Sequence, residues 1–429
     1  MRKCRRPEAD RVWPLLLCIA AFAVGAAQAA PTLRYKSLEA ETATEYQVGD
    51  SQLGPSYLRL IARGEWALSD SLTAKATVSP CGGSYSTHPK GVTQCAVYRL
   101  VEEFTLNGDY SRFNFSVGRQ VITQGNTEGF ILLDRFNGRD YCRFARLDVQ
   151  NKLPNWLAQG RASFSESTSL AVTFAPFSPV SYLPQTGSYC EDSYHNLGRF
   201  DGLHEPGNSS IADWGGGLEL ATKHDQWSAG LNVMTVTEDI FVLETVPTLE
   251  KTRPRTLWLG GTAAATLGGK IVLRGEVAFA PNRMFTLDPS VLGGLLARGS
   301  TTNGTDGRRE LLAAVGVEGS ADEWFWAVQY FQDRIERGPR LVQNNDGHFM
   351  SLRLRRSFMN DRLAFESFAV YDIDYSDVAL RASVSYEIND ATAVTVGGTA
   401  YSDIDNNTGL FGSYSGRESL FLKFRRTFF

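Results

Sequence analysis

Basic side chains recur at alternate positions in several short segments of this 429-residue sequence. In the segment 57–68, Arg59 and Arg63 alternate with apolar residues, and near the other end of the chain Lys423 and Arg425 do the same. An extended strand points successive side chains to opposite faces, so each segment would present a charged face and an apolar face. Guanidinium and ammonium groups attract carboxylates and phosphates, so a surface assembled from the charged faces would favour anions.

Thirteen basic residues fall on such faces, against seven acidic ones. The basic set is Arg59, Arg63, Lys75, Arg99, Arg112, Arg161, Arg274, Arg353, Arg355, Arg362, Arg381, Lys423 and Arg425, and the acidic set is Glu65, Glu103, Glu276, Glu318, Glu366, Asp377 and Glu387. Burying unpaired charge is very costly, so these faces are expected to line a hydrated space. Two interpretations follow: a self-paired network that fills the space, or a pore whose basic lining favours anionic solutes.

The elements that would position these residues follow a repeated pattern: two alternating strands, a tight turn and a longer polar connection. The eight tight turns are rich in Gly, Asn, Asp and Ser, which suit hairpins: Ser69-Asp70-Ser71, Asn107-Gly108-Asp109, Ser165-Glu166-Ser167, Lys223-His224-Asp225, Gly268-Gly269, Ser320-Ala321-Asp322, Met359-Asn360-Asp361 and Ile388-Asn389-Asp390. Eight hairpins give sixteen strands, and one further strand at each end (33–46 and 416–429) brings the count to eighteen, with sixteen as the fallback.

The connections between hairpins are longer than the turns: roughly 80–95, 122–153, 179–211, 238–254, 283–307 and 404–415. Transmembrane β-barrels have this asymmetry, with short periplasmic turns and long external loops. A secreted sandwich or propeller would also alternate, but the apolar faces here carry aromatic residues such as Trp324 and Tyr330, which suit a membrane interface. We therefore predict an all-β fold, one transmembrane antiparallel barrel over residues 30–429 in contact with outer-membrane lipid.

The N-terminus has the features of a signal peptide over residues 1–29. Basic residues precede a mostly apolar stretch from Pro14 to Gly25, and Ala27-Gln28-Ala29 follows with small side chains at the cleavage position. Removing the five basic and two acidic residues of this segment leaves 38 basic and 45 acidic residues, a net charge of −7. This balance argues against nucleic acid as a partner. Export implies insertion by the barrel-assembly machinery, and the predicted location is the outer membrane of a Gram-negative cell.

Four cysteines remain after the predicted cleavage: Cys81, Cys95, Cys142 and Cys190. None forms a CxxC pair, and an exported chain meets an oxidising compartment, which favours disulfides over zinc. Three pairings are possible. We favour Cys81 with Cys95 and Cys142 with Cys190.

Motifs for catalysis or for cofactor binding are absent from the sequence. It has no GxSxG elbow and no phosphate-binding glycine loop, and its five histidines show no metal-ligand spacing. The segment Asp403-x-Asp405-x-Asn407 begins like a calcium loop, but Thr408 stands where glycine is needed, so a solvated turn is the favoured interpretation. We predict no catalytic residues, no metal, no cofactor and no enzymatic activity.

One segment resembles a known group of proteins. Val117-Gly118-Arg119-Gln120, followed by Gly125 and Leu132-Leu133-Asp134-Arg135-Phe136-Asn137, is similar to Gram-negative porin-like proteins of the alginate-export type and to related uncharacterised outer-membrane families. Thr123-Gln124 departs from the aromatic residue that many relatives carry. The resemblance implies an eighteen-stranded barrel with a transport role. It also implies that Arg119, Gln120 and Asp134 anchor the long third external loop where it enters the barrel.

Three functions are compatible with the sequence. The leading hypothesis is an outer-membrane channel that passes anionic or polar solutes, with polysaccharide among the candidates. The second is a conduit for lipids or hydrophobic compounds that works with periplasmic or inner-membrane transport components; its predicted apolar lumen residues are Leu157, Val272, Leu312, Phe325 and Phe331. The third is a structural or adhesive barrel whose acidic loops bind partners.

Overall fold

The structure is a computed structural model that describes residues 32–48, 52–84, 100–127, 132–145, 147–148, 151–178, 181–183, 213–245, 247–342, 346–403 and 409–429. The wall strands are β1 (Thr32–Gln47), β2 (Gln52–Ser69), β3 (Leu72–Val78), β4 (Cys81–Ser84), β5 (Val101–Tyr110), β6 (Phe113–Gln120), β9 (Asn155–Ser163), β10 (Thr168–Ala175), β11 (Gly215–Lys223), β12 (Trp227–Thr237), β15 (Arg255–Leu267), β16 (Ile271–Thr286), β17 (Thr305–Ala321), β18 (Trp324–Ile335), β19 (Asp346–Phe358), β20 (Leu363–Asp372), β21 (Asp377–Asn389), β22 (Thr392–Asp403) and β23 (Ser419–Thr427).

The shorter elements lie in the connections between wall strands. Two small hairpins pair β7 (Gly138–Arg139) with β8 (Lys152–Leu153) and β13 (Val242–Glu244) with β14 (Glu250–Thr252). The helices are α2 (Tyr141–Ala145), α3 (Pro289–Ala297) and the 3-10 turn η6 (Gly412–Tyr414). Within the described residues, no helix has the length and apolar character needed to cross a membrane.

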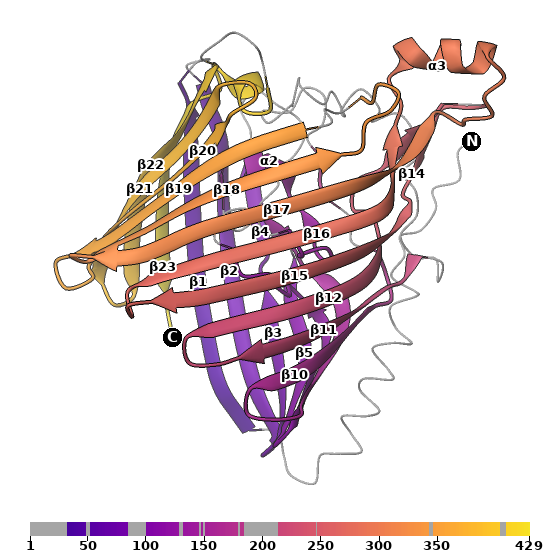
Figure 1. Ribbon diagram of the computed structural model, residues 1–429. Helices are drawn as coiled ribbons and strands as arrows, with labels where there is room; N and C mark the ends of the chain where they lie inside the picture. Colours follow the sequence, from indigo (N-terminus) through magenta and orange to yellow (C-terminus); the bar gives the residue numbers. More distant parts are fainter. Residues whose placement is uncertain are drawn as a thin grey trace, which may run out of the picture.

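The wall strands form one closed antiparallel barrel. Each strand pairs with its neighbours in sequence, and β23 closes the sheet against β1. β3 and β4 both pair with β2 as successive parts of one strand, so the 19 strand segments make eighteen wall strands. Figure 1 shows β12 and β15–β18 crossing the front wall, with the N-terminal strands in indigo behind them. Closure gives each of the eighteen wall strands a partner on both sides, as a lipid environment demands. The predicted fold class and strand count are confirmed.

The tight turns lie close to where the sequence predicts them, with one exception. The predicted turn Asn107-Gly108-Asp109 is wrong, because these residues lie inside β5. Gly108 pairs with Phe115 across the ladder, and a Cβ atom on Gly108 would lie only 2.2 Å from Cε1 of that ring. The glycine therefore makes room for a cross-strand aromatic ring, and the chain turns later, at Ser111 and Arg112.

The outer surface of the barrel is apolar. On β12, Leu231 and Val233 are exposed, whereas Asn232 and Met234 between and after them are buried on the inner side. The same alternation holds on the neighbouring strand, where Leu257 and Leu259 are exposed on either side of the buried Trp258. An outward apolar band around a closed barrel is the surface that lipid covers.

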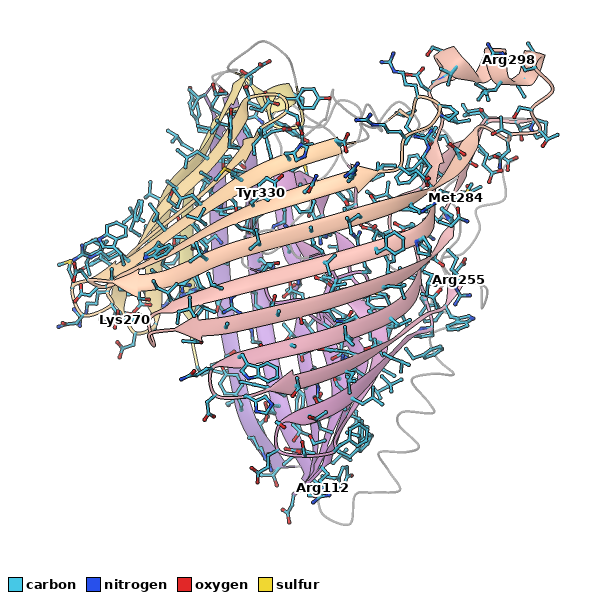
Figure 2. All side chains as sticks on the ribbon, viewed as in Figure 1. Arg112, Arg255, Lys270, Met284, Arg298 and Tyr330 are labelled. Carbon is cyan, nitrogen blue, oxygen red and sulfur yellow. The ribbon has the colours of Figure 1, made fainter. Side chains whose placement is uncertain are left out.

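The two ends of the barrel differ. Figure 2 shows Arg112 and Lys270 at the end that carries the tight turns, and Arg255, Met284 and Arg298 at the end that carries the long connections. The first residue of β1 and the last of β23 belong to the end with the tight turns, since Thr32 pairs with Ala67 and Thr427 pairs with Glu39. In outer-membrane barrels this end faces the periplasm.

Candidate functional site

The connection between β6 and β9 folds into the barrel, and its described residues (121–127, 132–145, 147–148 and 151–154) are called the inner loop below. Ile122, Leu132, Leu133 and Phe136 of this loop are buried in one apolar cluster with side chains of the wall. The wall residues of this cluster are Leu157, Ala175, Met234, Val236, Trp258, Ala278, Ala280, Leu312 and Ala314. Removing this apolar surface from water holds the inner loop on the wall from β9 to β17.

Two glycines of the wall give the inner loop its seat. A Cβ atom on Gly260 would lie 2.1 Å from Cδ2 of Leu133, and one on Gly217 would lie 3.1 Å from Cζ of Phe136. Any larger residue at Gly260 would push Leu133 away from the wall. The wall therefore has a hollow shaped for this part of the loop.

A carboxylate of the wall binds the same part of the loop. Oε1 of Glu276 on β16 accepts hydrogen bonds from the backbone N–H groups of Leu132 and Leu133, both at 2.6 Å. Oε2 accepts from the backbone N–H of Asn126 and from Oγ1 of Thr127, both at 3.1 Å. Glu276 is buried inside the barrel. The sequence pattern predicted an inward-facing acid at this position but did not predict the loop residues that it binds.

The inner loop is also closed on itself. The side-chain amide of Asn137 donates to the backbone oxygen of Ile122 and, at 2.6 Å, to Oδ1 of Asp134. Asp134 forms an ion pair with Lys152. These contacts join the beginning, middle and end of the inner loop.

The three residues that the resemblance implies as loop anchors lie in different surroundings. Nε of Arg119 donates to the backbone oxygen of Val101 at 2.7 Å, and Ser116 donates to the side chain of Gln120 at 2.7 Å. These contacts lie within the wall at the entry to the inner loop, whereas Asp134 lies inside the loop. The anchoring role of the three residues stays a prediction.

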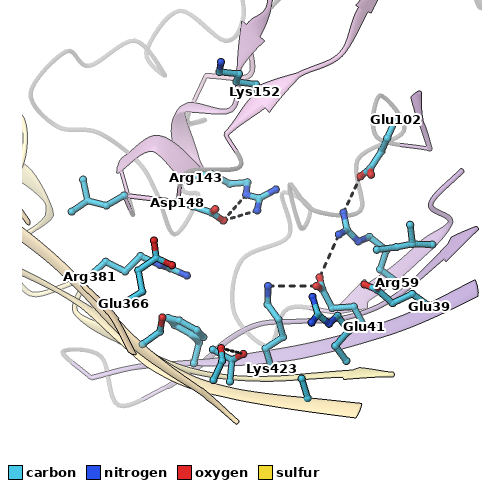
Figure 3. Close-up of a pocket in the computed structure, with 18 of the residues that line it drawn as sticks. Glu39, Glu41, Arg59, Glu102, Arg143, Asp148, Lys152, Glu366, Arg381 and Lys423 are labelled. Carbon is cyan, nitrogen blue, oxygen red and sulfur yellow. Dashed lines mark hydrogen bonds and ion pairs between the residues drawn. The ribbon is translucent and has the colours of Figure 1, made fainter. Parts of the chain in front are cut away.

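A cavity of about 710 Å³ lies between the inner loop and the wall formed by β20–β23, β1 and β2. It is called the main cavity below, and Figure 3 shows its charged lining. Seven basic and six acidic side chains line it: Arg59, Arg63, Arg143, Lys152, Arg381, Lys423 and Arg425, with Glu39, Glu41, Glu102, Asp148, Glu366 and Glu387. Five of the seven basic residues come from the predicted pore lining. Arg143 and Lys152 come from the inner loop, which the alternation pattern does not cover.

Arg59 is the centre of an ion-pair network on this wall. Its guanidinium lies 2.9 Å from Glu102 and 3.5 Å from Glu41, and Glu41 lies 3.4 Å from Lys423 (Figure 3). Tyr57 also donates to Glu41, at 2.9 Å. Much of the charge on the wall is therefore paired, as the self-paired interpretation expects.

On the opposite side of the main cavity, α2 presents a second strong pair. Arg143 lies 2.5 Å from Asp148. Burial lowers the pKa of the Arg143 guanidinium, but the carboxylates of Asp148 and Asp140 outweigh it and raise that pKa above its usual value. Arg143 is thus a permanently charged side chain at the edge of the cavity.

The remaining predicted lining residues lie at several places in the barrel. Arg353 pairs with Glu366 at 2.6 Å, Arg274 with Glu318 at 2.5 Å and Arg161 with Glu219 at 3.3 Å. Arg355 lies over the ring of Phe325, and Arg381 of the main cavity lies over that of Phe421. Arg112 is in the β5–β6 turn at the rim (Figure 2), and Arg99 lies outside the described residues.

A second cavity of about 270 Å³ lies on the other side of the inner loop, against β16–β19. Arg283 at its edge lies 2.9 Å from Glu238 and 2.7 Å from Glu310. Burial raises the pKa of Glu238, but the charges of Arg283 and Arg135 and the hydrogen bonds from Thr256 and Trp258 outweigh it and hold that pKa below its usual value. The sequence pattern missed this group because Arg283 falls in a predicted connection.

Most of the apolar residues predicted to line a hydrophobic conduit are covered. Leu157 and Leu312 are buried beneath the inner loop, and Phe331 packs against the same cluster. Phe325 lies under the guanidinium of Arg355. Leu157, Leu312 and Phe331 therefore serve the seat of the inner loop, whereas Phe325 is covered by an arginine.

The disulfide pairing and the absence of a metal both stay predictions. Cys81 and Cys142 are disulfide-bonded, whereas Cys95 and Cys190 lie outside the described residues, so the favoured pairing stays a prediction. The signal peptide and residues 404–408 of the calcium-like segment lie outside them too. In the part of the chain that the structure describes, no three His, Cys, Asp or Glu side chains gather into a metal site.

Comparison with known proteins relates this chain to others by structure. No family model matches the sequence, and no curated protein matches it. The crystal structure of OccAB1 of Acinetobacter baumannii matches with a TM-score of 0.50 and 10% sequence identity, covering 92% of this chain and 96% of that chain. OccAB4 of the same organism matches with the same score and identity, covering 92% and 97%. At this identity the similarity shows the fold alone, a closed antiparallel barrel of eighteen strands. The apolar outer band of this barrel is the surface that lipid covers in outer-membrane barrels, which places this chain in the outer membrane.

Proposed function

We propose that the barrel is a passive outer-membrane channel for small polar solutes, with a preference for anions. The solute path is the main cavity between the inner loop and the wall of β20–β23, β1 and β2. The observation that carries the proposal is the charged lining of this cavity, with basic residues on the wall and on the inner loop that faces it. Charged groups around a hydrated constriction select solutes by sign.

The balance of paired and unpaired charge supports the preference for anions. Five of the six acids of the lining have basic partners: Glu39 with Arg63, Glu41 with Arg59 and Lys423, Glu102 with Arg59, Asp148 with Arg143, and Glu366 with Arg353. Lys152 is paired with Asp134, which lines the second cavity and not the main one. Arg425 forms no ion pair with any described residue. Basic charge therefore exceeds acidic charge along the path, although by a small margin.

Acidic sugars are the anions that we propose as candidate substrates. The support is the resemblance of residues 117–137 to alginate-export-type barrels, together with the guanidinium groups of the lining, which bind carboxylates well. Acid sugars of one or two rings are the proposed size class, because the inner loop occupies part of the lumen.

Swelling of liposomes that contain the purified barrel tests this proposal. Galacturonate should enter liposomes that contain the barrel faster than it enters protein-free liposomes. The ratio of the galacturonate rate to the galactose rate should be lower for the variant Arg425→Glu than for the unaltered barrel. Arg298→Gln, at the end of α3 outside the lumen, should leave the ratio unchanged. Swelling with galactose alone would contradict the preference for anions, and the absence of swelling with either sugar would contradict the channel.

A further inference from the structure

We propose that Glu276 is the positioning residue that sets the width of this channel, because its carboxylate holds the inner loop against the wall. The inference rests on the proposed function, since the width matters only if solutes pass. It concerns a residue that does not line the main cavity.

The geometry of the attachment is specific. Each oxygen of the Glu276 carboxylate accepts two hydrogen bonds, and the four donors are Asn126, Thr127, Leu132 and Leu133. Three of the four donors are backbone N–H groups. Residues 126–127 and residues 132–133 of the inner loop are therefore bound to the same side chain of the wall.

The charge of Glu276 makes this attachment strong. Glu276 is 4% exposed, and no basic side chain among the described residues pairs with it. A buried carboxylate without partners is very unfavourable, so the four donors of the loop offset part of the cost of burying Glu276. If the loop moves away, the carboxylate loses its donors at the same time.

Two glycines permit the close approach. Gly125 has φ +98°, a conformation that favours glycine, and a Cβ atom there would lie 2.5 Å from Oε2 of Glu276. Gly260 provides the space for Leu133, whose N–H is one of the four donors. The carboxylate and the hollow at Gly260 thus act on the same residue of the loop from two sides.

Hydrogen exchange and single-channel recording on the full barrel test this inference through two variants. Glu276→Gln replaces one acceptor oxygen by a donor that faces the N–H or O–H groups of the loop. Gly260→Ala pushes Leu133 from its seat without any change of charge. Gly275→Ala is the matched control, because a Cβ atom there meets nothing closer than 4.0 Å.

Both variants should expose the amides of Leu132 and Leu133. A hydrogen bond to a charged group is worth about a tenfold factor or more in an equilibrium constant, so exchange at these amides should be about tenfold faster or more. Both variants should also give larger and noisier current steps, and Gly275→Ala should resemble the unaltered protein in both measurements.

The outcomes separate this inference from the proposed function. Faster exchange with larger steps in both variants supports the role of Glu276. If Glu276→Gln changes only the ion selectivity, while exchange and step size stay the same, Glu276 acts through its charge alone and the inference is overturned. If both variants speed exchange but the unaltered barrel carries no current, the attachment of the loop stands and the channel function falls.

Discussion

Lys152 and Asp134 form an ion pair across the inner loop, with Lys152 at the edge of the main cavity and Asp134 at the edge of the second one. The Asp134 side chain is 2% exposed and that of Lys152 is 18% exposed. The pair therefore ties the last part of the loop to its middle and neutralises a lysine that lines the main cavity.

Asp134→Asn should loosen the inner loop and make the channel more selective for anions. Breaking a buried ion pair costs about 3–5 kcal/mol, and the partial exposure of Lys152 places this one near the lower end. The unneutralised ammonium then adds a positive charge beside the main cavity. In a salt gradient, a shift of the reversal potential toward the equilibrium potential of the anion would show this effect. Asp361→Asn, in the β19–β20 turn, should cause no shift.

Arg59→Gln should destabilise the barrel, because it leaves Glu41 and Glu102 without the guanidinium that lies between them. The loss should be about 3 kcal/mol, since one partner of a buried network is removed. Arg309 provides the comparison, because its pair with Glu336 is exposed, and Arg309→Gln should cost at most about 1 kcal/mol. Urea unfolding in lipid vesicles measures both, and equal losses would contradict the central place of Arg59 in the network.

The pair of Glu238 and Arg283 should make the stability of the barrel depend on pH. The pKa of Glu238 is lower in the folded barrel than in the unfolded chain. Its contribution is therefore complete above the unfolded value, about 4.3, and is lost as the pH falls from there through the lower folded value. Between neutral pH and pH 3, the unfolding midpoint of the unaltered barrel should fall more steeply than that of Glu238→Gln. Parallel curves would mean that Glu238 contributes nothing to the acid dependence.

Leu231 tests the assignment of the outer face to lipid. It lies midway along β12 and is 66% exposed. An arginine on the lipid side of a barrel costs about 2–4 kcal/mol at the bilayer midplane, so Leu231→Arg should lower the free energy of unfolding in vesicles by this amount. Leu296→Arg, on α3 away from the wall, should have little effect. A neutral result for Leu231→Arg would mean that this face does not contact lipid.

The wall of the barrel could be predicted from the sequence because the signals for its strands and turns lie within short segments of the chain. The alternation of apolar and polar residues and the recurrence of turn residues are enough to give eighteen strands. The first strand, expected at 33–46, is Thr32–Gln47. The failure at Asn107-Gly108-Asp109 has the opposite cause, since the packing of Phe115 over Gly108 depends on the partner strand and overrides a local turn signal.

The interior could be predicted only in part. Arg59, Arg63, Arg381, Lys423 and Arg425 line the main cavity, as the alternation pattern suggests, because wall position alone fixes the face on which they lie. The inner loop could not be predicted, since Glu276 binds backbone N–H groups more than 140 residues away in the chain, and backbone groups carry no sequence signal. The apolar Leu132, Leu133 and Phe136 within a polar connection were the available sign of a buried loop.

The central claim, a channel with a weakly basic path, is tested most directly by single-channel currents across a planar bilayer with a salt gradient. The unaltered barrel should give discrete conductance steps, and its reversal potential should lie on the side of the equilibrium potential of the anion. Arg425→Glu should move the reversal potential toward the equilibrium potential of the cation. The absence of conductance, or a strong preference for cations in the unaltered barrel, would contradict the claim.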